Sequence, residues 1–391
     1  MGKRDAVIVS AVRSAIARQG GALAPLQAHE FGAIVLQEVL KRANIDPIEV
    51  DDIILGNVSS GGGNIARLTS LQAGFPFSTT GITIDRQCGS SINAVILAAQ
   101  AIQAGVGDIF IAGGTESLSR APYLMDRPTK GYDHALPKFR PQQLSPKDIG
   151  DPPMGITAET LAEKYSITRE EQDEFAYNSQ QKMANAMRSG YFDEQIVPIT
   201  IPIRKGAPFV FTEDEHPRPK TTKEGLSKLP PAFLHGGTVS AGNSSGINDG
   251  ACALVVMSRE VAEKRGLSIL AVIRGSSISG VDPKVMGIGP VSAVKSLLAR
   301  IRMTLNQIDL IECNEAFAAQ TLAVDRELQF DVNKLNVNGG AIAHGHPLGA
   351  TGAVLMTKAI YELARRKQQF GLITACIGGG QGIAILVERE S

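Results

Sequence analysis

The chain has 391 residues, 43% of them hydrophobic and 20% charged, with 39 basic and 39 acidic side chains. This length predicts two or three domains, and the balanced charge argues against nucleic-acid or membrane-surface binding as a main function. No apolar run is long enough to span a bilayer, and no room for a secretory signal precedes the first predicted strand. We therefore expect a cytoplasmic protein.

The first third of the chain alternates between helix-like and strand-like patterns. Apolar residues at helical spacing predict a helix over 31–43, and a short apolar run predicts a strand over 51–58. The stretch 83–102 passes from a strand into a helix with a glycine at the turn, and a glycine-ended strand follows over 108–114. Such alternation predicts mixed or mainly parallel sheets covered by helices.

The same order of elements returns near the end of the chain. We expect a helix over 292–301, a strand over 308–317, a strand–turn–helix over 335–360 and a glycine-ended strand over 372–380. The strand of the stretch 335–360 is expected over 335–338. Each half closes on a further strand, over 252–258 and over 382–388. This internal repeat predicts two pseudo-symmetric, layered α/β halves packed together. Their glycine-rich turns should face one site, because sites in α/β sheets gather at strand carboxyl ends.

One difference between the halves explains the middle of the chain. The last two strands of the second half are joined directly, whereas residues 115–249 separate the corresponding strands of the first half. This segment is rich in Pro, Lys and Glu, and Thr168 with Glu171 forms a predicted capping box at the start of a helix. We expect three domains: an N-terminal half over 1–119 completed by 250–270, an inserted loop domain over 120–249, and a C-terminal half over 271–391.

Cys88 is the first candidate for chemistry, among four cysteines that lie far apart and fit free thiols better than disulfides. It follows a predicted strand and precedes a predicted helix, and a thiol at a helix N-terminus gains thiolate character. Gly89 is expected to leave room for a substrate carbonyl at the Cys88 amide. The alternative is a cysteine that fills a tight turn. Cys252 and Cys313 are expected to be buried strand residues.

The second candidate is the loop 339–349, where His344 and His346 stand among small residues. No Cys, Asp or Glu lies nearby as a third ligand, so a general base is favoured over a metal site. Cys376 precedes a glycine run that lacks the ending of a phosphate loop but offers N–H groups to an oxyanion. Asn314 could position a water, whereas Glu315 is as readily a brace for its loop.

Six ordered motifs then resemble the thiolase family along essentially the whole chain. They are CGSS at 88–91, AGNSSGINDGA at 241–251, GVDPKVMGIGP at 280–290, NEAFAAQ at 314–320, NVNGGAIAHGHPLGATG at 336–352 and CIGGGQG at 376–382. The resemblance implies an α/β fold of two layered α-β-α-β-α halves with an inserted loop domain. It also implies an acyltransferase that cleaves 3-ketoacyl-CoA with CoA, or condenses two acetyl-CoA, by a ping-pong mechanism through an acyl-cysteine. Coenzyme A would be a substrate, no cofactor or metal would be held permanently, and the protein would be a homotetramer or homodimer.

The resemblance also implies roles for individual residues. Cys88 would be the acylated nucleophile, His346 its activating base, and Cys376 the acid and base at the α-carbon. Asn314 would hold a water that forms one oxyanion hole with His346, and the N–H groups of Cys88 and Gly378 would form the other. The implied substrate positions are Ser245 at the pantetheine arm, Met286 and Phe317 in the acyl pocket, and Arg218 at the adenine end. Met154 would be a further residue that binds substrate or CoA.

The chain departs from the family pattern at three places. His344 replaces a typical Leu or Ile, which could perturb His346 or merely fill space. Pro153 stands where short-chain biosynthetic thiolases usually carry histidine, and the segment 126–150 is shorter and richer in Pro, so these two departures leave the acyl-chain preference open. A broad-range degradative 3-ketoacyl-CoA thiolase therefore remains an alternative. A 3-ketoacyl synthase would use two separated histidines and lack Cys376, and a nicotinamide dehydrogenase would need a GxGxxG turn that is not found. A non-catalytic lipid-binding relative should have lost Cys88, His346 or Cys376.

Overall fold

The computed structural model describes residues 4–128, 130–132, 136–203 and 206–390. The N-terminal half contains β1 (Ala6–Ser14), β2 (Ala17–Arg18), α1 (Ala28–Ala43), η1 (Pro47–Glu49), β3 (Asp52–Gly56), α2 (Ile65–Gln72), β4 (Thr80–Ile84), α3 (Ser90–Ala104), β5 (Ile109–Ser117) and η2 (Leu118–Arg120). The middle of the chain contains β6 (Leu124–Met125), β7 (Phe139–Arg140), α4 (Met154–Lys164), α5 (Arg169–Arg188), β8 (Ile196–Val197), β9 (Ile199–Ile201), β10 (Phe209–Phe211) and α6 (Lys223–Ser227).

The remainder carries β11 (Asn248–Ser258), α7 (Arg259–Lys264), β12 (Ala271–Gly280), η3 (Pro283–Ile288), α8 (Gly289–Ile301), η4 (Leu305–Gln307), β13 (Leu310–Cys313), α9 (Ala318–Leu328), α10 (Ala341–His344), α11 (Thr351–Arg366), β14 (Phe370–Ile377) and β15 (Gln381–Glu388). Within the described ranges, every helix is too short or too polar to cross a membrane.

The sheet order shows the internal repeat directly. Its strands run β13-β14-β15-β12-β1-β11-β5-β3-β4, and a short antiparallel contact between β1 and β12 joins the halves at Val7–Val272 and Ile8–Ala271. Outward from this contact, the first half reads β1-β11-β5-β3 and the second reads β12-β15-β14-β13. In each half the antiparallel pairs (β5–β11, β14–β15) lie toward the centre and the parallel pairs (β3–β5, β13–β14) lie at the outer end, so the predicted repeat and mixed sheets are confirmed.

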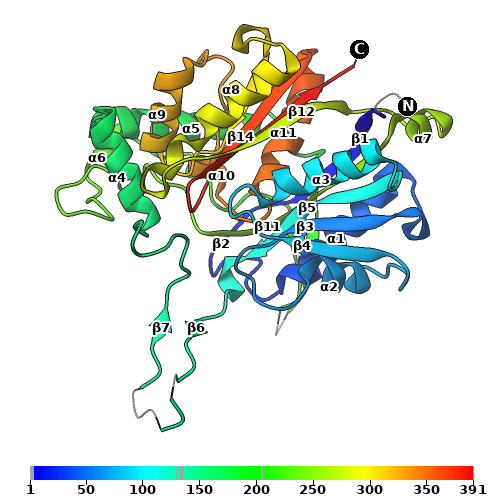
Figure 1. Ribbon diagram of the computed structural model, residues 1–391, viewed down its shortest axis with the longest axis horizontal. Helices are drawn as coiled ribbons and strands as arrows, with labels where there is room; N and C mark the ends of the chain where they lie inside the picture. The colour runs from blue at the N-terminus through cyan, green and yellow to red at the C-terminus, as the bar shows by residue number, and fades with distance from the viewer. Residues whose placement is uncertain (1–3, 129, 133–135, 204–205, 391) are drawn as a thin grey trace.

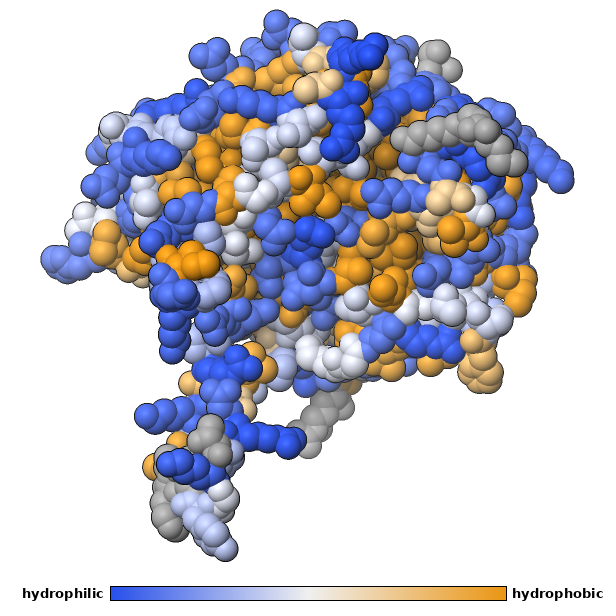
Figure 2. Space-filling model, in the orientation of Figure 1, coloured by the Kyte–Doolittle hydropathy of each residue, from blue (hydrophilic) through white to orange (hydrophobic). Residues whose placement is uncertain are grey.

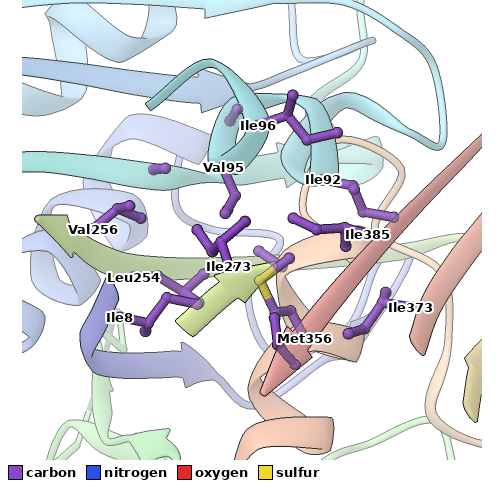
Figure 3. Packing of buried hydrophobic residues seen from close by; sticks show 14 of the residues in the cluster. Ile8, Ile92, Val95, Ile96, Leu254, Val256, Ile273, Met356, Ile373 and Ile385 are labelled. Carbon is purple, nitrogen blue, oxygen red and sulfur yellow. The ribbon is translucent and has the colours of Figure 1, made fainter. Parts of the chain in front are cut away.

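The helices and the two half-sheets form five layers. Helix α1 packs on the outer face of the first half-sheet, on β1, β5 and β11, and α8 packs on the outer face of the second, on β12, β14 and β15. Between the half-sheets lie α3 and α11, which contact each other and both sheets. Figure 3 shows this central core, where Ile92 of α3 and Met356 of α11 pack near Ile385 of β15. The layered α-β-α-β-α fold expected from the sequence is therefore confirmed.

The strand predicted over 335–338 is wrong, and the difference shapes the site. Only Leu335 pairs with Ile311 of β13, at the position that β4 occupies in the other half. Asn336 then adopts a φ of 43°, and its side-chain amide bonds both the N–H and the C=O of Cys313 at 2.9 Å. One side chain thus replaces a strand partner, and the backbone is released into the loop that carries His346.

The segment between β5 and β11 holds all the elements from η2 to α6. Strands β6 and β7 form an arm that leaves the body (Figure 1), and α4 and α5 then return to it. The capping box of α5 is confirmed, since Thr168 and Glu171 each bond the other's backbone N–H. The three domain ranges stay a proposal, which the long excursion between two adjacent strands supports.

Candidate active site

Cys88 lies in a locked turn between β4 and α3. Gln87 adopts a φ of 44°, and its N–H donates to Asp85 Oδ1 at 2.8 Å. The Ser90 hydroxyl accepts from the Arg86 N–H and donates to the Gln87 carbonyl. This turn holds the sulfur of Cys88, a half-buried residue, 3.3 Å from Nε2 of His346, which comes from the other half of the fold.

The hydrogen bonds of His346 set its tautomer. The Thr351 hydroxyl donates to the Pro347 carbonyl at 2.8 Å and lies 2.7 Å from His346 Nδ1, so it accepts the Nδ1 proton. The Nε2 lone pair therefore faces Cys88. Burial lowers the pKa of His346 to about 4 and raises the pKa of Cys88 to about 11, so both groups are neutral at rest. The thiol can then give its proton to Nε2 as the sulfur attacks.

The last residues of β14 and the turn after it bring Cys376 and Gly378 to the same place. The N–H of Gly378 and that of Cys88 point at the Cys88 sulfur and favour its charged form. Cys376 is buried, which raises its pKa, and a charge on Cys88 would raise that pKa further. The two amides can bind an oxygen that develops negative charge beside Cys88.

Gly89 allows two parts of the site to approach closely. A Cβ atom built on it would lie 2.6 Å from Cδ1 of Ile377, so a side chain there would require Ile377 to move. The glycine therefore lets the turn of Cys88 pack against the end of β14.

Asn314 and Glu315 are adjacent but differ in their partners. Both amide atoms of buried Asn314 lack a hydrogen-bond partner within the part of the chain that the structure describes. Glu315 accepts from Ser179 at 2.7 Å, from Asn336 at 2.8 Å and from the Ile342 N–H at 3.2 Å. Glu315 is thus a brace between loops, whereas Asn314 has its full capacity left for a water or a ligand.

The predicted acyl-pocket residues lie together around Cys376. Met286 and Phe317 are buried in one apolar cluster with Cys376, and Met154 packs against it. The sequence reasoning missed Phe233, whose ring meets Phe317 edge-on at 5.9 Å between centroids. It also missed Leu144, which lies over Gly378 in the same region. Both lie in irregular segments, where no periodicity of apolar residues marks them.

Ser245 and Arg218 line a cleft of about 640 Å³ beside this pocket. Phe233 lines the cleft and also contacts Phe317, so it lies between the two spaces. Arg18 and His216 are further lining residues that the sequence reasoning missed, although the run EDEHPRPK at 213–220 is a visible charge signal. The guanidinium groups of Arg18 and Arg218 in this cleft suit phosphate groups, whereas burial lowers the pKa of His216 to about 4 and leaves it neutral.

Comparisons with known proteins agree with this arrangement. The family descriptions "Thiolase, N-terminal domain" and "Thiolase, C-terminal domain" match residues 6–260 and 267–389. The acetyl-CoA acetyltransferase of Cupriavidus necator is 47% identical over 391 residues, which cover 99% of this chain and 100% of that protein. A probable acetyl-CoA acyltransferase of Staphylococcus epidermidis is 44% identical, with 98% of each chain covered.

Two solved structures are also similar throughout. The Bacillus anthracis acetyl-CoA acetyltransferase superposes with a TM-score of 0.95 at 46% identity, covering 99% of each chain. Human mitochondrial 3-ketoacyl-CoA thiolase in complex with CoA gives 0.93 at 39% identity, covering 99% of this chain and 98% of that one. The chain therefore belongs to the thiolase family.

Proposed function

We propose that this protein is an acyltransferase that cleaves 3-ketoacyl-CoA with free CoA and runs the reverse condensation of two acetyl-CoA. The observation that carries the proposal is the 3.3 Å contact between Cys88 Sγ and His346 Nε2, beside Cys376 at the end of β14 and Gly378 just after it. The relatives at 44–47% identity are acetyl-CoA acetyltransferases and a probable acyltransferase, which supports the same chemistry.

In the first half-reaction, the Cys88 thiol gives its proton to His346 and its sulfur attacks the 3-keto carbon. The bond between C2 and C3 then breaks, leaving an acyl group on Cys88, and the acetyl-CoA carbanion takes a proton from Cys376. In the second half-reaction, the CoA thiol gives its proton to the Cys376 thiolate and its sulfur attacks the acyl-cysteine. Cys88 leaves as a thiolate and recovers its proton from His346.

Two groups of donors would stabilise the oxyanions that form in these steps. The amides of Cys88 and Gly378 would hold the oxygen of the acyl group on Cys88. A water on the unpartnered amide of Asn314, together with His346, would hold the thioester oxygen of the second acyl-CoA. Preformed donors of this kind are worth about 10²–10³-fold in rate.

Coenzyme A would lie along the cleft with its thiol end toward Cys88. Ser245 would contact the pantetheine arm, and Arg218, with Arg18 and His216 nearby, would face the nucleotide end. The solved complex of human 3-ketoacyl-CoA thiolase with CoA supports coenzyme A as a ligand of this fold. The acyl group would extend among Met154, Met286 and Phe317.

We propose that the protein is a homo-oligomer. The outermost strand β4 leaves one edge unpaired among the described residues, with Ile82 46% exposed on it and Phe77 88% exposed just before it. Apolar residues gather on the face of the body seen in Figure 2, whereas the arm is mostly hydrophilic there. A cytoplasmic location is also proposed, and the four free thiols favour it.

Thiolysis of acetoacetyl-CoA and of a longer 3-ketoacyl-CoA, with free CoA present, tests the function. We expect the wild type to cleave acetoacetyl-CoA and Cys88→Ser to lose this activity by at least about 10³-fold, because the thiolate is lost. Cleavage confined to acetoacetyl-CoA would make the protein an acetyl-CoA acetyltransferase, and equal cleavage of both would make it a broad-range degradative thiolase. No cleavage of either by folded wild type would contradict the proposed function.

A further inference from the structure

Glu116 is a buried carboxylate near the end of β5 that the proposed mechanism does not use. Its Oε1 accepts from the Ser59 N–H at 3.0 Å and the Ser60 hydroxyl at 2.8 Å. Its Oε2 accepts from the Val58 N–H and from the Gly349 N–H, both at 2.9 Å. These four close donors satisfy the carboxylate, which has no access to solvent.

The Gly349 contact joins the two halves of the molecule. Glu116 belongs to the first half, whereas Gly349 closes the loop of the second half that carries His346. The loop packs directly against the backbone of β3 and β5. Cβ atoms on Gly56 of β3 and Gly114 of β5 would lie only 2.4 and 2.0 Å from the Gly349 carbonyl oxygen. No side chain fits at either glycine, so the loop rests directly on backbone.

Two backbone hydrogen bonds hold the His346 loop, one on each side of Pro347 and Leu348. The His346 N–H donates to Asn248 Oδ1 at 2.9 Å, and the Gly349 N–H donates to Glu116. Thr351 fixes the tautomer of the imidazole, but the place of the ring depends on where these anchors hold the backbone. We propose that Glu116 is a positioning residue, which holds the loop so that His346 Nε2 stays within reach of Cys88; this rests on the proposed function.

The charge of Glu116 and its contact with Gly349 should affect the reactivity of Cys88 in opposite directions, which makes the proposal testable. The Glu116 charge is one of the causes that raise the pKa of Cys88. Removing that charge alone would therefore ease ionisation of the thiol and speed its reactions. Losing the anchor would instead move His346 away and slow them. A displacement of about 1 Å in such a contact can cost about 10²-fold in rate.

The experiment follows alkylation of Cys88 by iodoacetamide between pH 6 and 9, with the modified peptide assigned by mass spectrometry. Glu116→Gln should react about 10- to 100-fold more slowly than wild type at pH 7, approaching the rate of His346→Ala. Glu116→Asp keeps the charge but is too short to reach both loops, so it should also be slow. It serves as the second variant if Glu116→Gln folds poorly.

Ser60→Ala is the matched control, because it removes a donor to the same carboxylate on the side away from Gly349. It should alkylate within about threefold of wild type, even if its melting temperature falls as far as that of Glu116→Gln. Glu116→Gln that reacts as fast as wild type, or Ser60→Ala that is slowed equally, would overturn the proposal. Alkylation needs no acyl-CoA turnover, so failure of the proposed function would appear separately, as wild type that alkylates normally but cleaves no substrate.

Discussion

His344 and His346 stand two residues apart, but their surroundings give them different properties. His346 has a partner for each ring nitrogen, Thr351 on one side and Cys88 on the other. His344 is buried, and neither of its nitrogens has a partner in the described residues. Leaving such a group unsatisfied costs about 1–3 kcal/mol of folding stability. The histidine at position 344, where the family typically has Leu or Ile, therefore destabilises the fold.

The two histidines should therefore respond oppositely to substitution. We expect His346→Ala to lower kcat for thiolysis by about 10²–10⁴-fold, the usual contribution of a general base. His344→Leu should keep most activity, because it removes no contact of the site. Steady-state thiolysis of acetoacetyl-CoA, with circular dichroism to check folding, distinguishes the two. The reverse pattern would show that the base has been assigned to the wrong histidine.

At the scale of elements, the repeat made most of the fold predictable. Helices α1, α3, α8 and α11 and the strands that flank them follow the expected patterns, because each buries one apolar face or run. The stretch 335–338 has the sequence pattern of a strand, but the side-chain amide of Asn336 bonds the backbone N–H and C=O of Cys313, so the strand pairing ends after one bridge. A side chain that takes the place of a strand's backbone leaves no mark in the pattern of apolar residues.

The site was predictable where candidate residues stand beside an apolar run and a glycine-rich stretch. The sequence around Cys88, His346 and Cys376 has that pattern, and the repeat indicated that the three stretches meet. Glu116 and Phe233 have no such context, because their importance comes from contacts with Gly349 and Phe317, far away in the chain. Contacts of this kind become visible only in three dimensions.

The proposal that this protein is an oligomer rests on the edge of β4 that is unpaired among the described residues. Ile82→Lys places a charge on that edge, and desolvating it against a partner would be costly. We expect a smaller mass than that of wild type by light scattering. Val106→Lys is the control, since Val106 is 76% exposed but lies in a loop after α3. Monomeric wild type would contradict the oligomer, and an unchanged mass for Ile82→Lys would exclude this edge.

For the whole molecule, buried histidines couple stability to pH. Burial lowers the pKa of His344 well below 6.5, and nearby Lys358 and Arg13 lower it further. The unfolded chain takes up a proton as the pH falls through 6.5, whereas folded His344 does not, so this residue destabilises the fold increasingly below pH 6.5. Glu312 acts in the opposite sense, because burial raises its pKa to about 7 and the folded state then holds the extra proton between about pH 4.5 and 7.

A comparison of variants isolates the histidine from these other groups. His344→Leu should be more stable than wild type at pH 7.5 by about 1–3 kcal/mol, because two unpaired nitrogens are removed. Its advantage should grow by up to about 1.4 kcal/mol for each pH unit below 6.5, since leucine cannot be protonated in the unfolded chain. His344→Asn keeps unpaired polar atoms but does not titrate. Its free energy of unfolding should therefore change with pH as that of His344→Leu does, but should be lower at every pH. Urea unfolding at pH 7.5, 6.5 and 5.5 measures all three proteins, and an advantage that stays constant would mean that His344 takes up its proton within the fold.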